Sequence, residues 1–164
     1  TRVTLDSEFA LHPGLSARIF AVPGKVPLFM EGDEVKTDLI GEQTVGVRLS
    51  ANGKVAYYIP GCATVTDDLL EKIADADHVF FDGTLWDDDE MIRTGTGIKT
   101  GRRMGHIPVS GPDGSIARLA GIDAAKTDIH INNTNPILQP NGPERAFVLQ
   151  SGWSIAQDGQ EFTL

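Results

Sequence analysis

The stretch "TVGVRLSANGKVAYYIPGCATVTDDLLEKIADADHVFFDG", residues 44–83, holds the clearest structural pattern in the chain. It begins with alternating apolar residues over 45–49, which is typical of a strand with one buried face. Asn52-Gly53 then supplies the positive φ angles that a tight hairpin turn requires. Residues 55–59 form the returning arm, and a Pro-Gly pair follows them. The pattern therefore predicts a β-hairpin.

The second half of this stretch predicts a helix and then a short buried strand. Thr66 is placed to cap a helix within residues 64–77, and two aspartates follow it in the first turn, where the helix dipole favours negative charge. The apolar run 79–81 predicts a strand, which stops at Asp82-Gly83. A strand, a helix and a strand in this order are typical of a βαβ unit.

The rest of the chain repeats the alternation of helix and strand. The further elements predicted are a helix over 110–121 capped by Ser110 or Asp113, a strand over 126–132, a helix over 141–152, and a hairpin over 153–164 around an Asp-Gly turn. Before the hairpin, residues 1–43 predict one or two short strands, with an exposed polar excursion over 31–43. The fold class is α/β, with a mixed sheet and flanking helices.

Bulk composition excludes several classes of protein. The chain has 164 residues, 40% hydrophobic, which is enough for one globular region with its own core. A net charge of −9 argues against a nucleic-acid partner and against binding to anionic membranes. No apolar run approaches the ~20 residues of a membrane span. The single cysteine, Cys62, agrees with a reducing compartment, so we expect a cytoplasmic protein.

Polar residues gather directly after predicted strands, where open α/β sheets bind their ligands. The first cluster is "FFDGTLWDDDEM", residues 80–91. Asp82 leaves a buried strand directly and is a candidate metal ligand or general base. Asp87, Asp88 and Asp89 have two interpretations: they supply oxygen ligands to a cation, or they form the solvated acidic start of a helix.

The second cluster is a glycine-rich basic loop in an otherwise acidic chain, "GIKTGRRMGHIPVSGPDG", residues 97–114. It contains Lys99, Arg102, Arg103 and His106. Guanidinium and ammonium groups bind carboxylates and phosphates, so the loop indicates an anionic substrate. The alternative is a surface loop whose charges pair with the acidic cluster before it.

The third cluster is "DIHINNTNPIL", residues 128–138, in which a strand delivers a histidine and then stops in asparagines. His130 at the strand end is a candidate ligand, because neutral imidazole suits iron, zinc or copper. The alternative is a buried histidine beside a turn in which Asn133 or Asn135 bonds its own backbone. Both interpretations stay open on the residues alone.

Common catalytic motifs do not decide between these interpretations. The sequence contains no Walker loop, GxSxG elbow, CxxC pair or GxGxxG after a strand. His12 and His78 have no polar residues gathered near them in sequence, so we expect both to be structural. The residues alone therefore predict an α/β protein that binds anions and a metal at one end of its sheet.

Several motifs taken together resemble a known family. In chain order they are "FFDGTLWDDDEM", "TGRRMGH", "SGPDGS", "HINNTNPIL" and "PERA". They are similar to the coenzyme PQQ synthesis protein B (PqqB) family of the metallo-β-lactamase-like superfamily. The resemblance runs from about residue 44 to the C-terminus and is looser over 1–43. It implies an αβ/βα sandwich of which residues 1–164 form a single region, the C-terminal half.

The resemblance also implies how metals would be held. It places a zinc knuckle and an Asp/His metal motif in the N-terminal half, so structural zinc is expected only there. The late strand-end histidine of the superfamily matches His130, and a second histidine near the mouth matches His106. The aspartate that often follows the return strand of the hairpin is absent after Tyr58. Its absence favours a single Fe(II) with open positions over a dinuclear zinc hydrolase.

The function implied is a step in pyrroloquinoline quinone (PQQ) biosynthesis. The activity expected is iron- and oxygen-dependent hydroxylation of the tyrosine ring in a Glu-Tyr-derived precursor. The alternatives are a PQQ carrier that assists transport to the periplasm and a metallo-hydrolase. The partners implied are PQQ or its multi-carboxylate precursor, other proteins of the pathway and a second copy in a homodimer.

The resemblance assigns roles to the candidate site residues. His130 is the expected metal ligand, and Asp82 is a further ligand or orients one. Lys99 and Arg102 are expected to bind substrate carboxylates. The catalytic residues expected are His106 as a proton shuttle, and Asn132 and Asn133 as amides placed where oxygen charge develops.

Overall fold

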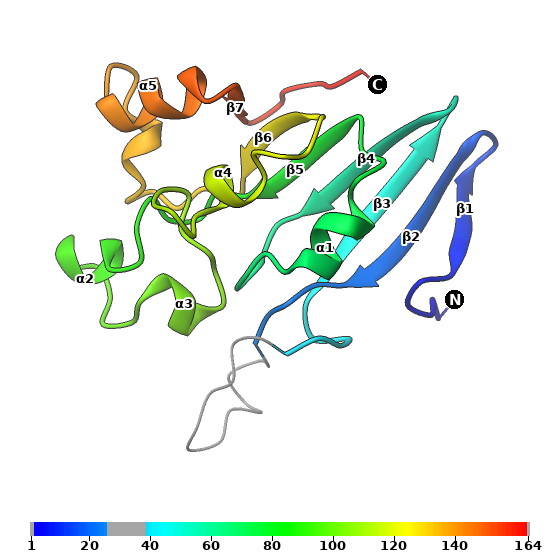
Figure 1. Cartoon of the computed structure of the whole chain (residues 1–164), viewed down its shortest axis with the longest axis horizontal. Helices are drawn as coiled ribbons and strands as arrows, with labels where there is room; N and C mark the ends of the chain where they lie inside the picture. Colours follow the sequence, from blue (N-terminus) through cyan, green and yellow to red (C-terminus); the bar gives the residue numbers. More distant parts are fainter. Residues whose placement is uncertain (1, 26–38, 164) are drawn as a thin grey trace.

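The computed structural model describes residues 2–25 and 39–163, and these form one mixed sheet of seven strands with flanking helices (Figure 1). The strands are β1 (Glu8–His12), β2 (Leu15–Ala21), β3 (Val45–Ala51), β4 (Lys54–Ile59), β5 (His78–Asp82), β6 (Ala125–Ile129) and β7 (Trp153–Ile155). They lie side by side in chain order, antiparallel from β1 to β4 and parallel from β4 to β7. The predicted α/β class with a mixed sheet is confirmed.

The helices connect the parallel strands and line their ends. They are α1 (Asp67–Lys72), α2 (Glu90–Arg93), α3 (Gly101–Met104), α4 (Ser115–Arg118), α5 (Pro143–Gln150) and the 3₁₀ turn η2 (Pro136–Leu138). None of the helices in the described part of the chain has the length and apolar character needed to cross a bilayer. Apart from α5, each is short, so packing on the sheet rather than intrinsic helix propensity stabilises them.

The hairpin and the βαβ unit predicted from residues 44–83 are both confirmed. Asn52 and Gly53 have φ angles of 53° and 76°, so the turn has the two left-handed residues of a type I′ hairpin. Thr66 caps α1, because its side chain accepts a hydrogen bond from the backbone N–H of Leu69 at 3.2 Å. β4 and β5 then pair in parallel, as a crossover helix between them requires.

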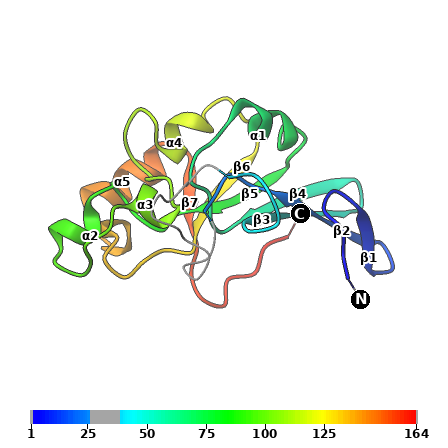
Figure 2. The same cartoon turned by 90° about the horizontal axis from the view of Figure 1, so that it is seen from below.

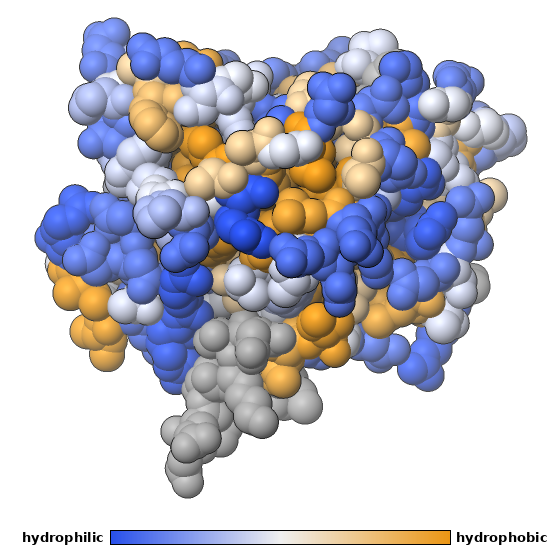
Figure 3. Space-filling model, in the orientation of Figure 1, coloured by the Kyte–Doolittle hydropathy of each residue, from blue (hydrophilic) through white to orange (hydrophobic). Residues whose placement is uncertain are grey.

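The core lies between the sheet and the helices on one of its faces. Tyr57, Ile59, Val79 and Phe81 alternate along β4 and β5 and are fully buried beneath α1 and α4. The turned view places these helices on one side and the C-terminal segment on the other (Figure 2). In the space-filling view, hydrophobic residues reach the surface near the centre of the helix side, bordered by hydrophilic ones (Figure 3).

The opposite face of the sheet is also apolar but carries no helix among the described residues. It holds a cavity of about 380 Å³. The lining residues are Val47, Leu49, Ala56, Tyr58, Phe80, Ile129 and Phe162. Phe162, from the C-terminal segment, lies edge-on to Phe80 with ring centroids 4.7 Å apart. This segment therefore covers part of the face.

The hairpin predicted over 153–164 is wrong. β7 instead pairs in parallel with β6, and residues 156–163 form no second strand. Gly159 does turn, with a φ of 77°. The chain after it does not return along β7, because Phe162 packs against His78 and Phe80. Tertiary packing thus overrides a local turn signal.

The predicted helix over 110–121 is shorter than expected and has a different cap. Gly114 is the N-cap of α4 and makes no side-chain bond. Ser110 lies four residues before this cap, and its hydroxyl donates to the Trp86 carbonyl at 2.7 Å. Asp113 is exposed. The predicted excursion over 31–43 lies outside the described residues as far as residue 38.

Candidate metal centre

The ends of β5 and β6 bring two of the candidate residues together. Asp82 and Ile129 are register partners, and the N–H of Gly83 donates to the Ile129 carbonyl at 2.8 Å. Gly83 permits this approach, because a Cβ there would lie 2.8 Å from the Cβ of Asp128. Asp82 and His130 therefore face the same end of the sheet, although 48 positions of sequence separate them.

The third residue arrives from the basic loop. Gly105 ends α3 with a φ of 90°, and His106 follows it. The backbone N–H of Ile107 then donates to the Cys62 carbonyl at 2.6 Å, which ties the loop to the end of β4. His106 Nδ1 lies 2.8 Å from Asp82 Oδ2, and its ring stacks on that of His130 with centroids 5.4 Å apart.

Asp82, His106 and His130 form a group that could hold a metal ion. One ligand atom from each lies within 4.8 Å of the others. Asp82 is buried, His106 is half-buried and His130 is exposed, so the group opens to solvent through the histidines. Two imidazoles and a carboxylate are donors that suit zinc or iron, so the residues present fit a transition metal.

His130 has a positive backbone φ, which is uncommon for residues other than glycine. Its φ is 55°, in the left-handed region. Strained positions of this kind cost on the order of 1–3 kcal/mol and cluster at functional sites. The turn is held by the N–H of Asn132, which donates to the Thr84 carbonyl at 3.1 Å. This conformation ends β6 and turns the imidazole toward Asp82.

The hydrogen bonds of Asp82 favour an orienting role over direct ligation. Oδ2 accepts from the Cys62 N–H at 2.9 Å and from His106, and Oδ1 accepts from the N–H and hydroxyl of Thr84 at 3.2 and 2.6 Å. These four bonds use the lone-pair positions of a carboxylate. Its assignment as a metal ligand stays a prediction.

Cys62 lies just after the return strand of the hairpin, and its thiol is not available as a metal ligand. Its thiol is buried and donates to the Thr64 carbonyl. Burial, and secondarily the charge of Asp82, raises the pKa of the thiol. A thiol held protonated is a poor metal ligand.

The asparagines after His130 build the turn. Asn135 accepts from the N–H of Ile137 at 3.1 Å and donates to the Gly83 carbonyl at 2.9 Å. Asn132 donates to the Thr134 hydroxyl at 2.8 Å. Asn133 alone of the three is exposed. With His130 it lines a cavity of about 570 Å³, so the geometry favours Asn133 over Asn132 as a group that can reach a ligand.

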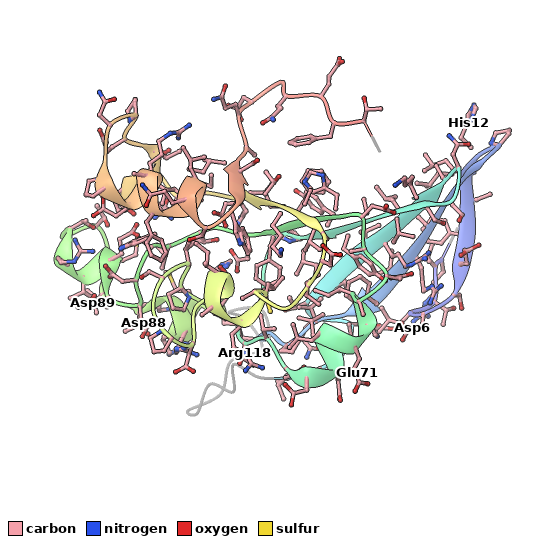
Figure 4. The ribbon with its side chains drawn as sticks, turned by 45° about the horizontal axis from the view of Figure 1, so that its top comes forward. Asp6, His12, Glu71, Asp88, Asp89 and Arg118 are labelled. Carbon is pink, nitrogen blue, oxygen red and sulfur yellow. The ribbon has the colours of Figure 1, made fainter. Side chains whose placement is uncertain are left out.

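The acidic cluster is a folded turn beside α2, and it does not reach His130 through any described contact. Asp87 pairs with Arg93, and Asp88 accepts from the Arg102 N–H at 2.7 Å. Figure 4 shows Asp88 and Asp89 at the α2 end of the molecule and His12 at the opposite end. The structure thus favours the helix-start interpretation of these aspartates.

The basic loop keeps two cations available. Within residues 2–25 and 39–163, neither Lys99 nor Arg102 forms a side-chain ion pair, and both are half-buried. Asp87 of the acidic cluster pairs with Arg93, which lies outside the loop. The structure therefore leaves the anion-binding interpretation of the loop intact.

Comparison with known proteins places the chain in a family. Residues 1–131 match the family model described as "Beta-lactamase superfamily domain". The chain belongs to the beta-lactamase superfamily. Among curated relatives in this superfamily, coenzyme PQQ synthesis protein B of Ruegeria pomeroyi is 68% identical over 99% of this chain and 55% of the relative. The coenzyme PQQ synthesis protein B of Rhizobium meliloti is 53% identical over 99% of this chain and 54% of the relative.

Solved structures in the superfamily agree. A crystal structure of Zn²⁺-bound PqqB from Methylobacterium extorquens matches with a TM-score of 0.95 and 50% identity, covering 99% of this chain and 55% of that one. A diphosphatase of the PhnP family matches with a TM-score of 0.56 and 18% identity, which shows the fold alone. The chain spans about half the length of the curated relatives it matches. The predicted resemblance to PqqB is confirmed; which half it represents stays a prediction.

Sequence reasoning missed one residue at the middle of the candidate metal centre. Thr84 is buried, and its hydroxyl contacts Asp82 and both histidines. Its position two residues after a strand-end aspartate was the available signal. Threonine is common in turns, so that signal was not specific.

Proposed function

We propose that the protein acts in PQQ biosynthesis by iron- and oxygen-dependent hydroxylation of the tyrosine ring in a Glu-Tyr-derived precursor. The observation that carries this proposal is the exposed His130 imidazole, held at the end of β6 beside the His106–Asp82 pair. The coenzyme PQQ synthesis proteins B at 47–68% identity support the pathway. The Zn²⁺ in the related crystal structure supports a metal in this fold.

His130 would hold the metal, with further ligands from outside this chain, which spans about half of its relatives. The chemistry that Fe(II) would supply there is activation of dioxygen, of which one atom would enter the ring and the other would leave as water, with two electrons and two protons taken from an external reductant. Within the chain, Asp82 holds the Nδ1 side of His106, which leaves Nε2 as the atom that can accept a proton. We assign to His106 the removal of the phenolic proton of the substrate.

We assign to the exposed amide of Asn133, which lines the cavity beside His130, the role of bonding oxygen atoms of the substrate. The cavity also contains Gln157 and Asp158 in its wall, so it offers both donors and acceptors. A polar cavity of this kind suits a substrate with several carboxylate and amino groups. The PQQ carrier remains the second candidate, since the same cavity can hold the finished quinone.

Lys99 and Arg102 are expected to bind the carboxylates of the substrate. Replacing both by Gln removes two cations that form no side-chain ion pair with the residues the structure describes, and each charge-assisted bond contributes about 1.5–3 kcal/mol. We therefore expect KM for the precursor to rise roughly 100-fold, with a smaller change in kcat. Steady-state kinetics measure this. Exposed Lys54, which pairs with Asp77 on the hairpin, is the matched control as Lys54→Gln. An unchanged KM in the double variant would remove the loop from the substrate site.

Aerobic incubation of the full-length protein with Fe(II), an external reductant and a diglutamyl-tyrosine peptide tests the proposed function. The expected result is a product that carries an added oxygen atom on the tyrosine ring, detected by mass spectrometry. Omission of iron or of oxygen should abolish it. Tight binding of PQQ without any oxidised product would decide for the carrier instead.

A further inference from the structure

The hydroxyl of Thr84 lies at the junction of all three candidate metal-centre residues. Oγ1 is 2.6 Å from Asp82 Oδ1, 2.8 Å from His130 Nδ1, 3.1 Å from the His130 carbonyl oxygen and 3.2 Å from His106 Nδ1. The residue is only 8% exposed. Its own N–H donates to Asp82, and its carbonyl accepts from Asn132. The hydroxyl is therefore held in place from both sides.

Counting protons decides the direction of these bonds. A threonine hydroxyl has one hydrogen and two lone pairs, whereas a carboxylate only accepts. The 2.6 Å contact to Asp82 is the shortest of the four, as expected for a charge-assisted O–H···O⁻ bond, so the hydroxyl donates to Asp82. The 2.8 Å contact to His130 must then be donated by the ring, through Nδ1–H.

This assignment fixes the form of both imidazoles. His130 carries its proton on Nδ1, so its lone pair is on Nε2, the form in which a histidine can ligate a metal through that atom. His106 also carries its proton on Nδ1, because that atom lies 2.8 Å from Asp82 Oδ2. No direct hydrogen bond joins Asp82 to His130 in the described part of the chain. Thr84 provides the connection.

We propose that Thr84 is a positioning residue whose hydroxyl links the Asp82 carboxylate to His130 by hydrogen bonds, so that one carboxylate orients both histidines. Asp82 bonds His106 directly, and it bonds His130 through the Thr84 hydroxyl. The inference rests on the proposed function only in treating His130 as a metal ligand. The relay itself is a property of the metal-free protein.

The first test uses the unmodified protein without metal. Nitrogen–proton correlation spectra of the histidine rings report which nitrogen carries the proton, at about pH 8, where imidazole is ordinarily neutral. His130→Gln identifies the His130 signals by their loss. We expect His130 to carry its proton on Nδ1. A ring protonated on Nε2 would overturn the proposal, whether or not the protein hydroxylates its substrate.

The second test removes the hydroxyl and keeps the shape of the side chain. Thr84→Val should weaken Zn²⁺ binding about 10- to 100-fold, as loss of an outer-shell partner typically does, and should leave His130 as a mixture of tautomers. Thr84→Ser should restore both properties. Wild-type Zn²⁺ affinity together with an unchanged His130 tautomer in Thr84→Val would overturn the relay.

Thr127→Val is the matched control. Thr127 is also a buried threonine, and its hydroxyl lies 2.8 Å from a histidine nitrogen, but the partner is His78. This variant should leave Zn²⁺ affinity and the His130 tautomer unchanged; a loss equal to that of Thr84→Val would mean a general packing effect and would overturn the proposal. Should Thr84→Val not fold, the tautomer of the unmodified protein and the Zn²⁺ affinity of Thr84→Ser decide.

Discussion

His130→Ala should abolish iron-dependent hydroxylation and weaken Zn²⁺ binding by more than the roughly 10- to 100-fold that an outer-shell change costs. The physical reason is that His130 is the exposed imidazole of the candidate centre, and its Nδ1 side is already held by Thr84. Turnover with Fe(II) and a chelator competition with Zn²⁺ measure the two effects. Full activity in this variant would exclude His130 as a ligand.

The backbone of His130 calls for a second variant beside alanine. The φ of position 130 is 55°, at which alanine is strained, so a loss of activity in His130→Ala could also follow from a displaced turn. Asparagine tolerates left-handed angles far better, so His130→Asn removes the imidazole and keeps the turn. Both variants should lose metal binding alike. His12→Ala, at the far end of the molecule, should have no effect (Figure 4).

Asp128→Asn is expected to stabilise the protein at neutral pH by about 4 kcal/mol and to have almost no effect near pH 4. Asp128 is fully buried on β6, and neither carboxyl oxygen has a hydrogen-bond partner among the described residues. Burial, and secondarily the charge of Asp82, raises the pKa of this carboxyl to about 8. Its ordinary value is near 4.

The sign of the pH dependence follows from proton counting. Between about pH 4 and pH 8 the folded state keeps a proton on Asp128 that the unfolded state has released. The free energy of unfolding therefore falls by up to about 1.4 kcal/mol per pH unit across this window and levels off above it. Below the window both states are protonated and the contribution is fully present.

Urea unfolding of the wild type and of Asp128→Asn at a series of pH values measures the difference directly. The gain in the variant should grow from about pH 4 to about pH 8 and then stay constant. Exposed Asp123→Asn, a few residues earlier, is the matched control and should show no such trend. A difference between Asp128→Asn and wild type that does not vary with pH would contradict the raised pKa.

The local elements were predictable because their causes are local. Asn52-Gly53 specifies a type I′ turn through two positive φ angles, and Thr66 caps a helix through a bond to a residue three positions away. Asp82 and His130 were predicted as site residues because each lies at the end of a buried strand. Parallel strands end at a shared edge, so their polar successors meet there.

The failures came from interactions between distant segments. The hairpin predicted after Trp153 did not form, because Phe162 packs on the open sheet face against Phe80. Ser110 was predicted as a cap, but its hydroxyl bonds Trp86 in another loop. Both residues had plausible local roles. Contacts with residues far away in the chain determined the observed structure, because burial and long-range hydrogen bonds outweigh a weak local propensity.

The sequence by itself determined the α/β class, the hairpin with its βαβ unit, and a strand-end histidine in "DIHINNTNPIL". Only the tertiary structure decided what surrounds that histidine. His130 adopts a left-handed backbone conformation, and Asn132 and Asn135 form hydrogen bonds within the turn that follows it. The Thr84 hydroxyl lies between Asp82 and both imidazole rings. The physical reason is that secondary-structure propensity and hydrophobic periodicity are properties of neighbouring residues in the chain. A carboxylate that orients two histidines depends instead on the distances between three separate segments, and only tertiary packing sets those distances.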